Sequence, residues 1–284
     1  MRTPSRFPQL QHRLSLRSSG LAVSPVCLGV VAEPDTVLAA FDAGINFFFV
    51  TADLHWPLYD PLRRGLAALL TRSPSLRDQI VVAVVSYTEK PDFLEASFDE
   101  VLAAVPGLGH IDAHILGGTY VPDFFPRLHY SRRLRADGVV GLRALGASFH
   151  DRQAAIHACN DELIDIAYVR YNALHAGARA DLFPHLRAGS STLLYNFKNV
   201  PYAFGDAAWR TLALDGYWRP QPTDFYRFIF TATPLDGMLC SLAAPEHVRA
   251  LADALGAGPV DDEEQQYLLD LCELVAGRAA LVAS

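Results

Sequence analysis

Short runs of apolar, β-branched residues recur along the chain, with amphipathic segments between them. The run from Ile80 to Val85 is apolar at every position, which is typical of a strand covered on both faces. Alternation of such strands with helices indicates repeated βα units around a parallel sheet. The expected strands are Val26–Val31, Ile45–Val50, Ile80–Ser86, Asp112–Gly117, Val139–Ala147, Leu163–Val169, Ser191–Asn196 and Gly237–Ser241.

Helices are expected between these strands, where apolar residues fall on one face. In Asp35–Ala43, for example, Val37, Leu38 and Phe41 share a face at helical spacing. The other expected helices are Leu58–Leu70, Pro91–Val105, Pro126–Ala136, Asp151–Cys159, Arg179–Arg187, Pro245–Leu255 and Asp261–Val275. The last begins with four carboxylates, which the positive end of the helix dipole favours, so this run is interpreted as a helix start and not as a metal site.

The length and the hydrophobic content fit one closed barrel. The chain has 284 residues, 51% of them hydrophobic, which suffices to bury one large core. An open doubly wound sheet would normally carry a Gly-x-Gly-x-x-Gly loop after its first strand, and Gly29-Val30-Val31-Ala32 lacks that pattern. No linker or change of composition divides the sequence. We therefore expect a single domain over residues 1–284, an α/β protein with the (β/α)8 TIM-barrel fold.

The charge of the chain excludes some classes of partner. Its formal net charge of -7 disfavours nucleic acids and anionic membranes, because binding to phosphates depends on Lys and Arg. No apolar run approaches about 18 residues, and residues 1–19 are basic and polar, unlike a secretory signal. These features predict a cytoplasmic protein.

Metal binding is not expected. The histidines His110, His114 and His150 have no acidic neighbour at the spacing of typical ligand pairs. The four cysteines show no Cys-x-x-Cys pair and are expected to be buried free thiols. They are Cys27, Cys159, Cys240 and Cys272.

Several segments resemble the bacterial aldo-keto reductases, in the order of that family and through nearly all of the chain. They are Arg13–Gly29, with Gly20 in a hairpin turn, Ala43–Phe48, Leu134–Ser148, Ile164–Asn172 and Leu194–Asn196. The most specific are the opening segment and Gly-Ile-Asn-Phe-Phe at residues 44–48. The resemblance implies an aldo-keto-reductase-type barrel with an N-terminal β-hairpin.

In that family a tyrosine protonates the substrate carbonyl, a lysine paired with an aspartate lowers its pKa, and a histidine orients the substrate. The resemblance puts Val50 at the place of the aspartate and His55 at that of the tyrosine. It puts Val85 at the place of the lysine and Gly117 at that of the histidine. None of the four catalytic residues is kept, so the catalytic tetrad is degenerate.

The family's cofactor clamp is also altered. There, a glycine and a basic residue after the eighth strand hold the adenosine phosphate at a helix N-terminus. Here the stretch from Leu239 to His247 has no glycine, lysine or arginine. Tyr195 matches the position whose ring stacks on the nicotinamide, and is the one retained feature. The resemblance therefore implies a protein without a cofactor.

Two interpretations of the segment His55-Trp56-Pro57-Leu58-Tyr59 stay open. His55 would replace the missing acid, with Asp53 or His114 nearby, or the segment packs over the barrel mouth with Trp56 and Tyr59 as apolar anchors. The alternative function is therefore a redirected enzyme. It would be an oxidoreductase with a relocated acid such as His55, or a lyase or isomerase that needs no nicotinamide.

Aromatic and amide side chains gather in the loops expected at the mouth, where they would form a pocket for a ligand or fill the former active site. We expect residues 199–223 to cover the mouth. The candidate ligand-binding residues are Asp53, His55, Trp56, His114, Asn172, Tyr195, Asn196, Lys198 and Tyr202. The favoured function is a catalytically inactive binding or accessory protein in a biosynthetic pathway, with a peptide, a small molecule or a partner protein at the mouth. The oligomeric state is left open, a homo-oligomer included.

Overall fold

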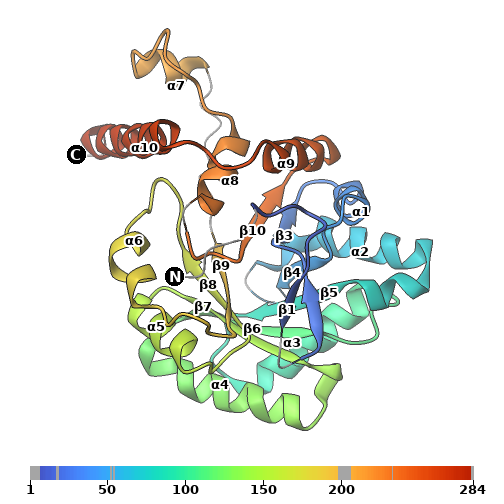
Figure 1. Ribbon diagram of the computed structural model, residues 1–284. Helices are drawn as coiled ribbons and strands as arrows, with labels where there is room; N and C mark the ends of the chain where they lie inside the picture. The colour runs from blue at the N-terminus through green and yellow to red at the C-terminus, as the bar shows by residue number, and fades with distance from the viewer. Residues whose placement is uncertain are drawn as a thin grey trace.

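Eight parallel strands form a closed barrel in the order β10-β3-β4-β5-β6-β7-β8-β9, with helices around it (Figure 1). The computed structural model describes residues 7–16, 19–51, 53, 55–197, 206–231 and 233–282. The barrel strands are β3 (Val26–Val31), β4 (Phe47–Thr51), β5 (Val81–Ser86), β6 (Ala113–Thr119), β7 (Ala144–Phe149), β8 (Ile166–Arg170), β9 (Leu193–Phe197) and β10 (Gly237–Leu242). The expected (β/α)8 barrel is confirmed, and each predicted strand overlaps one of these.

The largest error among the strands concerns β7. Residues 139–141 form a 3₁₀ turn, η3 (Val139–Gly141), and the strand begins only at Ala144. Gly138 and Gly141 have φ values of 70° and 74°, which bend the chain where the apolar pattern predicts an extended segment.

The helices between the strands agree with the predictions except at three places and at the end of the last helix, α10 (Asp262–Val282), which runs seven residues beyond the predicted end at Val275. They are α1 (Asp35–Asp42), α2 (Asp60–Arg72), α3 (Pro91–Ala104), α4 (Val121–Ala136), α5 (Arg152–Asn160), α6 (Ala178–Asp181), α7 (Asp206–Thr211), α8 (Pro222–Phe230), α9 (Pro245–Ala257) and α10 (Asp262–Val282). Helix α4 begins five residues before the predicted start at Pro126. The predicted helix Arg179–Arg187 is only the short α6, followed by the 3₁₀ turn η4 (Phe183–His185).

The third difference lies in the region expected to cover the mouth. Its described part, from residue 206 on, contains α7 and the start of α8, neither of which was predicted. Figure 1 shows α7 beyond α10, apart from the barrel strands. Helix α8 instead packs its aromatic face inward, with Phe225 and Phe228 buried. The described part of this region is therefore helical in part, with Trp209 and Leu212 buried, and residues 199–205 of it lie outside the described residues.

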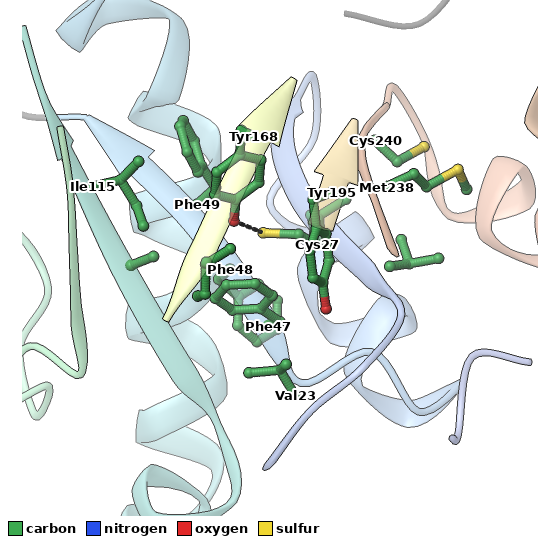
Figure 2. Packing of buried hydrophobic residues seen from close by; sticks show 14 of the residues in the cluster. Val23, Cys27, Phe47, Phe48, Phe49, Ile115, Tyr168, Tyr195, Met238 and Cys240 are labelled. Atoms are coloured by element: carbon green, nitrogen blue, oxygen red, sulfur yellow. Dashed lines mark hydrogen bonds between the residues drawn. The ribbon is translucent and has the colours of Figure 1, made fainter. Parts of the chain in front are cut away.

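The N-terminal hairpin is present as expected. Strands β1 (Leu14–Leu16) and β2 (Leu21–Val23) pair antiparallel, and Gly20 in the turn has a φ of 69°. Val23 lies below Phe47 in Figure 2, so the hairpin closes the end of the barrel where the strands begin. We call this end the floor and the opposite end, where the strands finish, the mouth.

Aromatic rings fill the interior of the barrel. The rings of Phe49 and Tyr168 lie 5.4 Å apart, centroid to centroid, although β4 and β8 are on opposite sides of the barrel. Contact between opposite strands passes through the interior, so these two rings cross it. Nearer the floor, Phe47 and Tyr195 make a second aromatic contact at 5.7 Å (Figure 2). The interior is therefore a packed core and not a channel.

Polar side chains satisfy the backbone at the floor in a repeated pattern. In each case the acceptor is the residue just before a strand, which is β4, β6, β8 or β10. The donor is a backbone N–H close to the beginning of the strand that precedes it in the chain. The four acceptors are Asn46, Asp112, Asp165 and Asp236. Buried N–H groups without a partner are costly, so these four side chains stabilise the beginnings of the strands.

The four cysteines are buried free thiols, as expected. None of the helices among the described residues is both long and apolar enough to span a bilayer.

Candidate functional site

The strand register shows which side chains face the mouth. Residues paired in register point to the same face of a sheet, and alternate residues point to opposite faces. Because Phe49 faces the interior, its partner Ala83 does so too, and the same reasoning continues around the barrel. The uppermost inward positions of five neighbouring strands are Val85, Gly117, Ser148, Arg170 and Phe197.

Two of the four positions that the resemblance assigns to the family's catalytic residues lie in this layer, Val85 and Gly117. Val50 does not, because it follows the inward-facing Phe49 and so points to the helices. The resemblance assigned Val50 to the place of the catalytic aspartate, which would face the interior. This assignment is corrected, because the interior side chain at this point of β4 is the Phe49 ring. His55 is exposed, in the turn before the 3₁₀ segment η1 (Trp56–Tyr59).

At Gly117, the position that the resemblance assigns to the family's histidine, the ring of Tyr87, the residue after β5, lies close by. A Cβ atom added to Gly117 would lie 2.7 Å and 2.8 Å from two carbons of the Tyr87 ring and 2.9 Å from the carbonyl oxygen of Ser86. Real Cβ atoms do not make contacts this short, so a side chain at residue 117 and the present position of Tyr87 exclude each other. The Tyr87 ring also lies 5.2 Å from that of His55.

The structure does not assemble a relay from His55, Asp53 and His114. The carboxylate of Asp53 accepts hydrogen bonds from the backbone N–H of Tyr87 and from the Thr51 hydroxyl. These bonds hold the end of β5 to the end of β4. His114 lies on the outer face of the barrel wall, where its ring packs at 5.3 Å against Phe98 of α3.

The hydrogen bonds of His114 define its protonation. The Ser131 hydroxyl donates to the carbonyl of Arg127, so its oxygen accepts from Nδ1–H of His114, which leaves Nε2 to accept from the Ser86 hydroxyl. Burial and, to a smaller extent, the nearby Arg127 guanidinium lower the pKa of His114 to about 3. The ring is neutral at physiological pH and is satisfied within the wall, so it neither binds a ligand at the mouth nor moves a proton there.

The 3₁₀ segment η1 anchors the loop above the barrel. The guanidinium of Arg63 lies 3.3 Å from the centre of the Trp56 ring and donates a hydrogen bond to the Trp56 carbonyl. Tyr59 is buried, and its ring lies 6.4 Å from that of Phe49. Of the two interpretations of this segment, the packing contacts are those expected of apolar anchors.

The remaining candidate residues are mostly internal. Tyr195 is fully buried, and its hydroxyl donates to the carbonyl of Ser24, which precedes β3 at the floor, so this ring does not line the mouth. The amide of Asn196 donates to the carbonyl of Tyr171. The side chain of Asn172 accepts from the N–H of His175. Lys198 and Tyr202 lie outside the described residues.

The residues after β10 do not fit the phosphate of a dinucleotide. The carbonyl of Ala243 accepts hydrogen bonds from the Ala32 N–H and the Thr36 hydroxyl. Helix α9 then begins with Ala244 as its N-cap, which offers no side-chain hydrogen bond. The first basic side chain is Arg249, more than a turn into the helix. A phosphate here would lack the charge-assisted hydrogen bonds that hold such groups.

A hollow at the mouth was not predicted from the sequence. Its volume is about 370 Å³, and it lies beside the N-terminus of α5, with Arg152, Arg170 and Asp181 in its lining. Arg170 ends the otherwise apolar strand β8 and faces inward. A charged residue at the mouth end of a barrel strand is the sequence signal that would have pointed to this place.

Solved structures show which fold class this is. An aldo-keto reductase from Bacillus halodurans in its holo form has a TM-score of 0.69 at 15% identity, covering 92% of this chain and 96% of that one. An aldo/keto reductase from Klebsiella pneumoniae, in complex with NADP and acetate, has 0.66 at 15%, covering 94% and 95%. A putative aldo-keto reductase from Pseudomonas aeruginosa has 0.65 at 18%, covering 88% and 98%.

The protein thus has the aldo-keto-reductase-type barrel fold. No protein-family model and no curated protein matches its sequence. The fold is shared with these solved structures.

Proposed function

We propose that this protein is a non-catalytic barrel that binds a ligand at its mouth. The observation that carries the proposal is the Tyr87 ring against Gly117. It fills the space of the substrate-orienting histidine, and so the position is closed by packing as well as changed in sequence.

The rest of the inward layer supports the same conclusion. Val85 and Phe49 are apolar and buried, and neither can donate or accept a proton. Asp53 is engaged by a backbone N–H and a hydroxyl at the strand ends. Proton transfer needs a titratable group within hydrogen-bond reach of the reacting atom, which Val85 and Phe49 do not provide, and both oxygens of Asp53 already accept hydrogen bonds. The turn after β10 also lacks the basic charge for a dinucleotide phosphate.

Titration with NADPH and with NADH, followed by nicotinamide fluorescence and by calorimetry, tests the proposal. We expect no saturable binding of either dinucleotide at low micromolar concentration, and no oxidation of NADPH when aldehydes and ketones are added. An aldo-keto reductase assayed in parallel is the positive control. Tight binding together with carbonyl-dependent oxidation of NADPH would show a redirected oxidoreductase and reject the proposal.

A further inference from the structure

The hollow beside α5 is lined by two arginines and two aspartates, and one of the arginines, Arg170, has no ion-pair partner among the described residues. Arg152 forms an ion pair with Asp181, which leaves neither charge uncompensated. The Asp151 carboxylate accepts from the backbone N–H groups of Gln153 and Ala154, as the N-cap of α5. With these charges accounted for, the guanidinium of Arg170 is the group left to bind something else.

Arg170 has no hydrogen bond or ion pair from its side chain to any described residue, and its Nε–H is buried without an acceptor. Leaving a buried charged donor without a partner costs free energy, because water no longer solvates it. A guanidinium presents a planar set of donors that matches a carboxylate or a phosphate with two parallel hydrogen bonds. The donors of Arg170 therefore suit an anion.

An apolar rim borders this charge. The ring of His150, which lines the hollow, stacks on Tyr120 at 5.5 Å and meets the edge of Phe197 at 5.9 Å. Tyr120 is 55% exposed, so its outer face is open to contact. A rim of this kind favours a flat or apolar group attached to the anion.

We propose that the mouth binds a small organic anion, whose carboxylate or phosphate pairs with Arg170 and whose apolar body lies against Tyr120 and Phe197. The volume of about 370 Å³ is within the range of small-molecule sites and too small for a folded partner. This inference rests on the proposed non-catalytic function and names the class of ligand for it.

Calorimetry with three probes of one shape tests the proposal: benzoate, phenyl phosphate and the uncharged benzyl alcohol. We expect at least one of the two anions to bind the full chain and benzyl alcohol not to bind. Binding of benzoate alone would assign the site to carboxylates, and binding of phenyl phosphate alone to phosphates. Failure of both anions to bind would overturn the proposal.

Two variants make the test specific. Arg170→Gln should weaken binding of the anion about 10- to 100-fold, the effect of losing hydrogen bonds to a charged group. The matched control is Arg72→Gln, which changes an exposed arginine at the C-terminal end of α2 that is paired with Asp42 and should leave binding unchanged. Equal binding by Arg170→Gln and the wild type would overturn the assignment to Arg170.

Stability separates a binding role from a structural one. Because the Arg170 side chain has no described partner to lose, the melting temperature of Arg170→Gln should equal or exceed that of the wild type. A clear fall would show that Arg170 holds the fold together and would refute the proposal. The nicotinamide titration is an independent test: anion binding with carbonyl-dependent NADPH oxidation would retain the site and reject the non-catalytic function.

Discussion

The exclusion between Gly117 and the Tyr87 ring can be measured as a free energy. In Gly117→Ala the new methyl group would lie 2.7 Å and 2.8 Å from two ring carbons, where carbon atoms prefer about 3.5–4.0 Å. The ring can rotate away, but the Ser86 carbonyl oxygen, at 2.9 Å, belongs to the strand backbone. Overpacking of this kind costs about 1–3 kcal/mol. Urea denaturation should show a loss of stability of that size.

A double-mutant cycle with Tyr87→Ala isolates the contribution of the ring. With the ring removed, Gly117→Ala should cost less, with a coupling free energy of about 1 kcal/mol or more. The control is Gly256→Ala in α9, where an added Cβ meets nothing within 4 Å and the helix should gain up to about 1 kcal/mol. If Gly117→Ala were neutral, or cost the same in both backgrounds, the ring would not occupy the position and the reasoning would fail.

Three further outcomes, each measured by urea denaturation, follow from the packing. Trp56→Ala should destabilise the protein by about 1–3 kcal/mol, because it removes the ring stacked on Arg63. Asp112→Asn should cost about 3–5 kcal/mol, because this carboxylate is the buried counter-charge of two arginines at the floor. The pKa of His114 is about 3 when folded against 6.5 unfolded, so only the unfolded chain takes up this proton between those values, and stability falls as the pH falls. In His114→Asn this pH dependence of stability, about 1.4 kcal/mol per pH unit between pH 6 and 4, should disappear.

The fold could be predicted because its determinants are local. An apolar run such as Ile80–Val85 marks a strand covered on both faces wherever it lies in the chain, and eight such runs define a barrel. The errors arose where conformation is set by a few residues. The bend at Gly138 and Gly141 delays β7, and Pro184 interrupts a helical pattern after α6. Helix α8 (Pro222–Phe230) was not predicted, and only its first two residues fall in the segment 199–223 that was expected to cover the mouth.

The site was harder to predict because it depends on which way each side chain points. The resemblance assigns Val50, just before Thr51, to the place of the family's catalytic aspartate. In the structure the side chain of β4 that faces the interior at this point is that of Phe49. The sequence predicts that His114 lies near Asp53 or His55 at the mouth. In the structure, side chains along β6 alternate between the two faces of the sheet, and that of His114 points outward to the helices. One residue of register moves a side chain from the interior to the helical layer, and sequence spacing alone does not fix that register.

The two ends of the barrel differ in whether their charged side chains have partners, and stability alone does not explain this difference. At the floor, Asp112 and Asp165 each accept a backbone N–H and pair with arginines, so burial of these charges is compensated. At the mouth, Arg170 stands in the same inward layer as Val85, and its side chain has no hydrogen bond or ion pair to a described residue. A side chain that contributes a buried, unpartnered Nε–H to the native state is unfavourable for folding, and such a group persists where it has another use. If Arg170→Met raises the melting temperature while abolishing anion binding, that use is recognition; if it lowers the melting temperature, the residue belongs to the fold.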